Sequence, residues 1–114
     1  MLEKRKLKRR QLIYYLKVMD GNTNELLGRL ADITTEGIML ISEKAIETER
    51  PFSLQLILPT GMRGGKKIDI EAKSLWSKRD VNPDLIDTGF RFIKISPEDL
   101  ETIDELILDY ELPN

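Results

Sequence analysis

The chain has 114 residues and contains neither cysteine nor histidine. Without cysteine it can form no disulfide and no thiolate site. Without histidine it lacks the commonest general base and the commonest transition-metal ligand, which excludes the usual Ser-His and Cys-His nucleophilic pairs. No apolar run approaches the 18 residues that would predict a membrane span, and no apolar segment follows the basic start as in a signal peptide. We therefore expect a cytoplasmic location.

Catalytic and cofactor motifs are also absent. The glycines at positions 61, 64 and 65 do not have the spacing of a phosphate-binding loop, and the carboxylates follow no metal-loop pattern. Most Asp and Glu residues fall at solvent-facing strand positions or on the terminal helix. We expect neither an enzyme nor a protein with a cofactor. The hydrophobic content of 40% still predicts a folded domain, and the length suits one domain.

Positive charge is concentrated in the first ten residues, MLEKRKLKRR, where six basic residues face one acidic residue and leave a charge of +5. The whole chain carries −2, so residues 11–114 carry about −7. Such blocks of like charge are usually interaction tails. The sequence thus divides into a flexible basic arm over residues 1–10 and a single domain over residues 11–114. The partner of the arm should be an anion: nucleic acid, lipid headgroups or a phosphate-bearing ligand.

Short apolar segments separated by turn residues predict six strands, the first two forming a hairpin. In the fifth, alternation places Ile70, Ser74 and Trp76 on one face. Six such strands predict a small antiparallel barrel or sandwich. The predicted ranges are 11–20, 26–33, 38–41, 51–58, 67–78 and 88–93.

After the last strand the apolar period becomes helical. Ser96 suits an N-cap, Pro97 suits the first turn, and the acidic pair that follows favours the positive end of a helix. This predicts a helix over residues 97–110 that closes one end of the barrel or lies across the sheet. The apolar face of this helix would consist of Leu100, Ile103, Ile107 and Tyr110.

A second informative segment is the stretch Asp32-Ile-Thr-Thr-Glu-Gly37. Asp32 and Thr34 are two residues apart at a strand end, so they point to the same side of the sheet. Gly37 permits a turn with positive φ, or the close approach of a ligand to the backbone. Two interpretations remain open: a ligand site, or a tight connection in which Asp32 and Thr34 bond their own backbone.

The order of these motifs resembles that of the PilZ domain, a bacterial module that typically binds cyclic di-GMP. The family pattern is a basic RxxxR element, then D/N-x-S/T-x-x-G, then a small-x-W strand end and a G-x-x-F strand. Asp32, Thr34 and Gly37 fit the second element, and Ser74-Leu75-Trp76 and Gly89-Phe90-Arg91-Phe92 fit the later ones. The resemblance covers residues 4–110. It implies a mainly β fold, a six-stranded antiparallel PilZ-like β-barrel with a C-terminal α-helix.

The basic element admits two registers. Arg5 and Arg9 form a literal RxxxR, but Arg10 has the usual family spacing, 22 residues before Asp32, and would pair with Lys6. The difference matters, because arginine presents a planar fork to phosphate or guanine while lysine offers a point charge.

The resemblance implies a receptor or adaptor in which the basic arm closes over cyclic di-GMP against the Asp-x-Thr-x-x-Gly turn and presents a new surface to an unidentified downstream protein. Asp32 would accept from the guanine edge, Thr34 would bond phosphate or base, and Gly37 would leave room. Trp76 is either a stacking wall near the rim or a core aromatic.

The alternative function is that of a divergent PilZ domain that binds no nucleotide and acts as a protein-interaction module. Nonspecific nucleic-acid binding is disfavoured by the acidic body and the single tryptophan. Attachment to a membrane surface is disfavoured because the arm has few apolar anchors.

Overall fold

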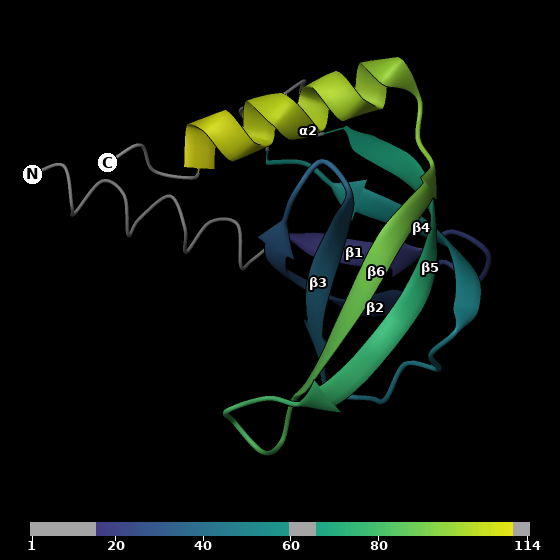
Figure 1. Cartoon of the computed structure of the whole chain (residues 1–114), viewed down its shortest axis with the longest axis vertical. Coiled ribbons are helices and arrows are strands. Elements are labelled where there is room, and N and C mark those ends of the chain that lie inside the picture. Colours follow the sequence, from purple (N-terminus) through teal and green to yellow (C-terminus); the bar gives the residue numbers. More distant parts are fainter. Residues whose placement is uncertain (1–15, 60–65, 111–114) are drawn as a thin grey trace, which may run out of the picture.

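A computed structural model describes residues 16–59 and 66–110, which form a closed antiparallel β-barrel with a helix across one end (Figure 1). Going around the barrel, the strand order is β1-β2-β3-β6-β5-β4, and β1 closes it by pairing with β4. The predicted six-stranded barrel with a C-terminal helix is therefore confirmed. The elements are β1 (Lys17–Asp20), β2 (Leu26–Ile33), β3 (Gly37–Ser42), β4 (Arg50–Ile57), β5 (Lys67–Arg79), β6 (Ile86–Lys94) and α2 (Pro97–Tyr110).

Most strand boundaries lie within two residues of their predicted positions. β6 begins two residues earlier than predicted because Ile86 pairs with both Arg79 and Ser42, so the neighbouring strands lengthen it. The first five residues of the predicted strand 11–20 lie outside the described residues, as do the glycines at positions 61, 64 and 65.

Alternating side chains from all six strands fill the barrel. Leu30, Leu40 and Leu56 are completely buried, and the helix adds Ile103 and Leu106 to the same cluster. Full burial of such a side chain contributes about 1.5–3 kcal/mol. The helical face proposed from the sequence omitted Leu106, although it lies one turn after Ile103. The helix thus closes one end of the barrel (Figure 1).

The beginning of α2 follows from its first residues. The Asp99 amide donates to the Ser96 hydroxyl over 3.1 Å, as expected for an N-cap, and acidic residues occupy the first turn. Within residues 16–59 and 66–110, no helix is long and apolar enough to cross a membrane.

A β-bulge in β2 changes which side chains face outward. The register with β3 shifts between Leu30 and Asp32, so Leu30 and Ala31 are both buried and Asp32 is exposed. Without the extra residue, Asp32 would share the inward face of Leu30.

A second bulge lies in β5, where the register with β6 shifts between Ser74 and Trp76. Ser74 is fully buried, whereas Trp76 is 41% exposed. The prediction that Trp76 shares a face with Ile70 and Ser74 is therefore wrong, because the extra residue, Leu75, turns the indole to the outside of the barrel.

One buried carboxyl, that of Asp87 on β6, gives folding stability a dependence on pH. Asp87 is 7% exposed, and within the described residues its Oδ1 atom has no hydrogen-bond partner. Burial and then hydrogen bonding with the Asp80 carboxyl raise the pKa of Asp87. Folding therefore favours the protonated acid. The stabilising effect is complete below the ordinary pKa of aspartic acid and is lost as pH rises through the raised pKa.

The substitution Asp87→Asn should therefore raise the free energy of unfolding near neutral pH, because an amide needs no proton and can still donate to Asp80. The advantage should shrink as pH falls towards the ordinary pKa of aspartic acid, about 3.9. Urea unfolding at several pH values measures the difference, and the control is Asp84→Asn, at an exposed position in the loop between β5 and β6. Parallel pH profiles for Asp87→Asn and the unmodified protein would contradict the assignment.

Candidate functional site

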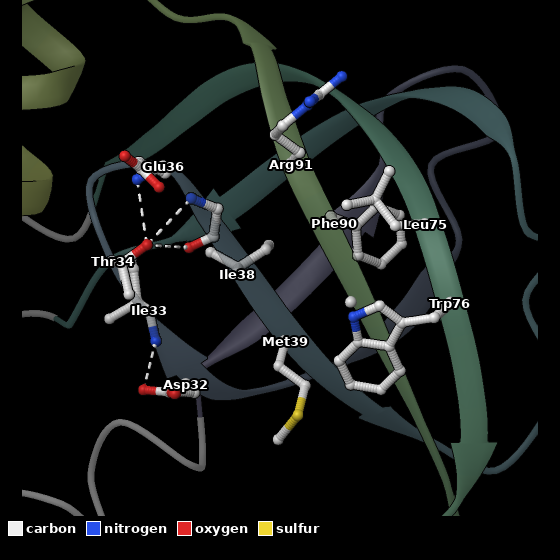
Figure 2. Close-up of a pocket in the computed structure, with 12 residues that line it drawn as sticks. Asp32, Ile33, Thr34, Glu36, Ile38, Met39, Leu75, Trp76, Phe90 and Arg91 are labelled. Atoms are coloured by element: carbon white, nitrogen blue, oxygen red, sulfur yellow. Dashed lines mark hydrogen bonds between the residues drawn. The ribbon is translucent and has the colours of Figure 1, made fainter.

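A depression on the outside of the barrel lies over β3 and β6, between the end of β2 and the bulge of β5. It has a volume of about 400 Å³, and we call it the barrel-face pocket. Figure 2 shows Asp32 and Thr34 on one side, Leu75 and Trp76 on the other, and Met39 between them. The two bulges turn Asp32 and Trp76 outward, so both residues reach the same pocket.

Asp32 lies at the open edge of the pocket. One carboxylate oxygen accepts from the backbone N–H of Ile33 over 2.9 Å (Figure 2). An ionised carboxylate has about four lone-pair positions, so this bond leaves acceptor capacity for a ligand. Asp32 can therefore accept from a planar donor edge while it keeps its backbone bond.

Thr34 organises the turn between β2 and β3. Its hydroxyl accepts from the backbone N–H groups of Glu36, over 3.1 Å, and Gly37, over 3.2 Å. The Thr34 amide also donates to the Gly37 carbonyl over 2.9 Å. Thr34 thus makes the local backbone bonds that one of the two interpretations predicted, while a bond from Thr34 to a ligand stays a prediction. The hydroxyl thus fixes the turn that follows Asp32 and contains Glu36.

Position 37 must be a glycine because the backbone of β6 lies too close for a side chain. A Cβ atom at this position would collide with the carbonyl oxygen of Phe90 and lie 3.3 Å from the Cα of Arg91. The φ of Gly37 is not in the left-handed region, so the first of the two uses that the sequence allowed for this glycine, a turn with positive φ, is not the one found. The glycine lets β3 approach β6 closely, and this contact forms the floor of the pocket.

Trp76 lies at the rim of the pocket and is 41% exposed, so it is not a core aromatic, while its role as a stacking wall stays a prediction. Its indole packs on Gly89, where a Cβ atom would lie 2.6 Å from Cζ2 of the ring and closer still to other ring atoms. Figure 2 shows the ring lying over β6. The glycine of the G-x-x-F pattern thus provides the space in which the tryptophan lies.

The substitution Gly89→Ala should displace the indole into solvent, because a methyl group would occupy its place. Trp76 is the only tryptophan, so a red shift of the emission and stronger quenching by acrylamide would report the displacement. Gly21→Ala is the control, since its Cβ would meet the Ser53 carbonyl oxygen at 3.2 Å and no atom of Trp76. If Gly89→Ala left the emission unchanged, the position of the Trp76 indole would not depend on the absence of a side chain at residue 89.

Arg91 also lines the pocket, although it was not among the site residues predicted from the sequence. It is exposed, opposite Gly37 on β3 and opposite Lys73 on β5. Directly opposed like charges are unfavourable in a sheet, and Lys73 is compensated by Glu49 at 3.5 Å. Arg91 therefore brings a guanidinium to the pocket edge. The sequence feature that could have identified Arg91 is its position in Gly89-Phe90-Arg91-Phe92, two residues after the glycine.

The basic candidates Arg5, Lys6, Arg9 and Arg10 lie outside the described residues. The first described residue after them is Leu16, whose carbonyl accepts from the Leu30 amide over 2.8 Å. Leu16 therefore lies beside Leu30 of β2, two residues before Asp32.

Solved structures with the same fold include the inhibitor of motility MotI/DgrA from Bacillus subtilis, with a TM-score of 0.68 and 16% identity over 81% of this chain. The chain spans 45% of the length of MotI. The PilZ domain of YcgR from Escherichia coli, solved with cyclic di-GMP, has a TM-score of 0.60 and 16% identity, covering 84% of this chain and 80% of that one. At this identity the likeness shows the fold alone.

A search of curated proteins finds no match. The sequence itself matches the PilZ domain over residues 3–109, nearly its whole length. The chain therefore belongs to the PilZ domain family.

Proposed function

We propose that this PilZ domain is a receptor for cyclic di-GMP and binds the nucleotide in the barrel-face pocket. The observation that carries the proposal is the convergence of Asp32 and Trp76, from opposite sides, on one depression with Arg91 at its edge. These three groups suit a nucleotide: a carboxylate for a donor edge, an aromatic ring for a base, and a guanidinium for a phosphate. The cyclic di-GMP in the PilZ domain of YcgR adds support for this ligand.

Each pocket group has a distinct role. Asp32 accepts from the N1–H and N2–H₂ groups of a guanine, and Trp76 stacks on a base. Arg91 binds phosphate with its planar fork. Thr34 holds the turn, and its O–H, which donates to the Gly37 carbonyl over a long 3.4 Å, can turn to a ligand oxygen. Gly37 keeps the floor open.

The basic arm supplies the remaining positive charge. Arg10 is six residues before Leu16, a distance of at most about 20 Å in an extended chain. Because Leu16 is bonded beside β2, this length suffices for the arm to reach over a ligand next to Asp32. Arm closure would bury the phosphates and present a new surface to a downstream protein.

Titration calorimetry with cyclic di-GMP tests the proposal. We expect saturable binding at or below tens of micromolar, weakened at least tenfold by Arg10→Ala. Comparing Arg5→Ala with Arg9→Ala determines the register, since a screened tail charge should cost less than a motif arginine. Absence of heat at tens of micromolar ligand would contradict the receptor function and favour the protein-interaction module.

A further inference from the structure

Lys78 lies beside the pocket, with its ammonium over the ring of Trp76. Its ammonium is 5.6 Å from the centroid of the Trp76 ring, two residues earlier on β5. The inner side of the indole is filled by the backbone of β6 at Gly89. The ammonium therefore lies over the outer face of the ring, the face on which a base would stack.

A second set of groups attracts the same ammonium. Lys78 is the cross-strand partner of Asp87. The Asp87 Oδ1 atom is buried and has no hydrogen-bond partner in the part of the chain that the structure describes. The charge of Lys78 acts on both Asp87 and Asp80, favouring the ionised form of each. The ammonium of Lys78 can thus contact either the Trp76 ring or the carboxylates of Asp87 and Asp80. In this structure it lies over the ring.

We propose that Lys78 determines which ligands can use Trp76: a base stacks on the indole only by displacing the Lys78 ammonium, which then moves towards Asp87 and Asp80. This inference rests on the proposed function and deepens it. An exposed cation–π contact is weak, while stacking of a base on an aromatic side chain is stronger, so a purine can exchange with the ammonium. An anion without a base cannot stack on the indole, so it has no means of displacing the ammonium from the ring.

The displacement is observable by NMR. The ring current of Trp76 should move the ε-methylene signal of Lys78 upfield of the other lysines, and this signal should be missing in Lys78→Met and normal in Trp76→Leu. Saturation with cyclic di-GMP should return it to the ordinary lysine position. A signal that stays upfield while calorimetry shows saturation overturns the inference and leaves the receptor function intact. Absence of any heat overturns the receptor function, and the inference with it.

Affinity gives an independent readout. Lys78→Met should bind cyclic di-GMP about two- to fivefold more tightly than Lys67→Met, because it removes a competitor for the ring. Lys67 is the matched control, an exposed lysine at the far end of the same strand whose loss changes the net charge equally. Weaker binding by Lys78→Met than by Lys67→Met would instead show that Lys78 contacts the ligand, and would overturn the inference.

Discussion

The substitution Gly37→Ala should destabilise the domain by about 3 kcal/mol, the upper end of the usual cost of overpacking. The added methyl group would collide with the Phe90 carbonyl oxygen, which belongs to the backbone of β6 and cannot rotate away. Relief requires β3 and β6 to separate, although these strands pair over six consecutive residues. Urea unfolding followed by circular dichroism measures the loss.

Gly21→Ala is the matched control for this prediction. Neither glycine has a left-handed φ, and both substitutions restrict the unfolded chain equally. At Gly21 the nearest atom, the Ser53 carbonyl oxygen, would be 3.2 Å from the new Cβ, which small shifts can accommodate. Equal unfolding free energies for the two variants would show that close approach to β6 is not the reason for glycine at position 37.

The fold was largely predictable from the sequence, because the apolar alternation of a half-buried strand is a local property. The two bulges were not predictable in this way. A register shift depends on the partner strand, and the residues around Leu30 and Ser74 carry no local mark of an extra residue. Because one residue of shift reverses every later side chain, the bulge at Leu75 accounts for the wrong face assigned to Trp76.

The candidate site was likewise predictable where it depends on neighbouring residues in the sequence, and not where it depends on strand pairing. Asp32, Thr34 and Gly37 are contiguous in sequence, so their spacing alone placed them at one turn. Arg91 reaches this turn only because β6 pairs with β3, a contact between residues more than 50 positions apart. The physical role of Gly37 was equally hidden, since the atom that requires a glycine belongs to Phe90.

The substitution Asp32→Ala should weaken binding of cyclic di-GMP at least about 100-fold. Hydrogen bonds to a charged group contribute roughly 1.5–3 kcal/mol each, and loss of two such bonds to a guanine edge exceeds the 2.8 kcal/mol of a 100-fold change. Asp32 is exposed and makes one backbone bond, to Ile33, so the fold should persist. Calorimetry on the variant, with its circular dichroism unchanged, measures the effect.

The sign of this effect separates recognition from simple electrostatics. Removing a negative charge near a dianionic ligand should, by charge alone, strengthen binding. Asp69→Ala provides that comparison, because Asp69 is an exposed aspartate that accepts from Gln55 on the β4–β5 side of the barrel. We expect Asp69→Ala to bind as tightly as the unmodified protein or slightly tighter, while Asp32→Ala loses affinity despite its more favourable charge. Similar affinities for the two variants would mean that Asp32 does not contact guanine.

A comparison of guanine with adenine as the base of the ligand tests directly whether Asp32 recognises guanine. Adenine presents an acceptor at N1 where guanine presents a donor, so a carboxylate at this edge should favour cyclic di-GMP over cyclic di-AMP. Asp32→Asn keeps the shape of the side chain but loses its charge and can turn its own N–H groups towards the base. It should therefore lose most of the preference for guanine, and Asp69→Ala should retain it in full. A preference that survives Asp32→Asn unchanged would assign guanine recognition to other residues.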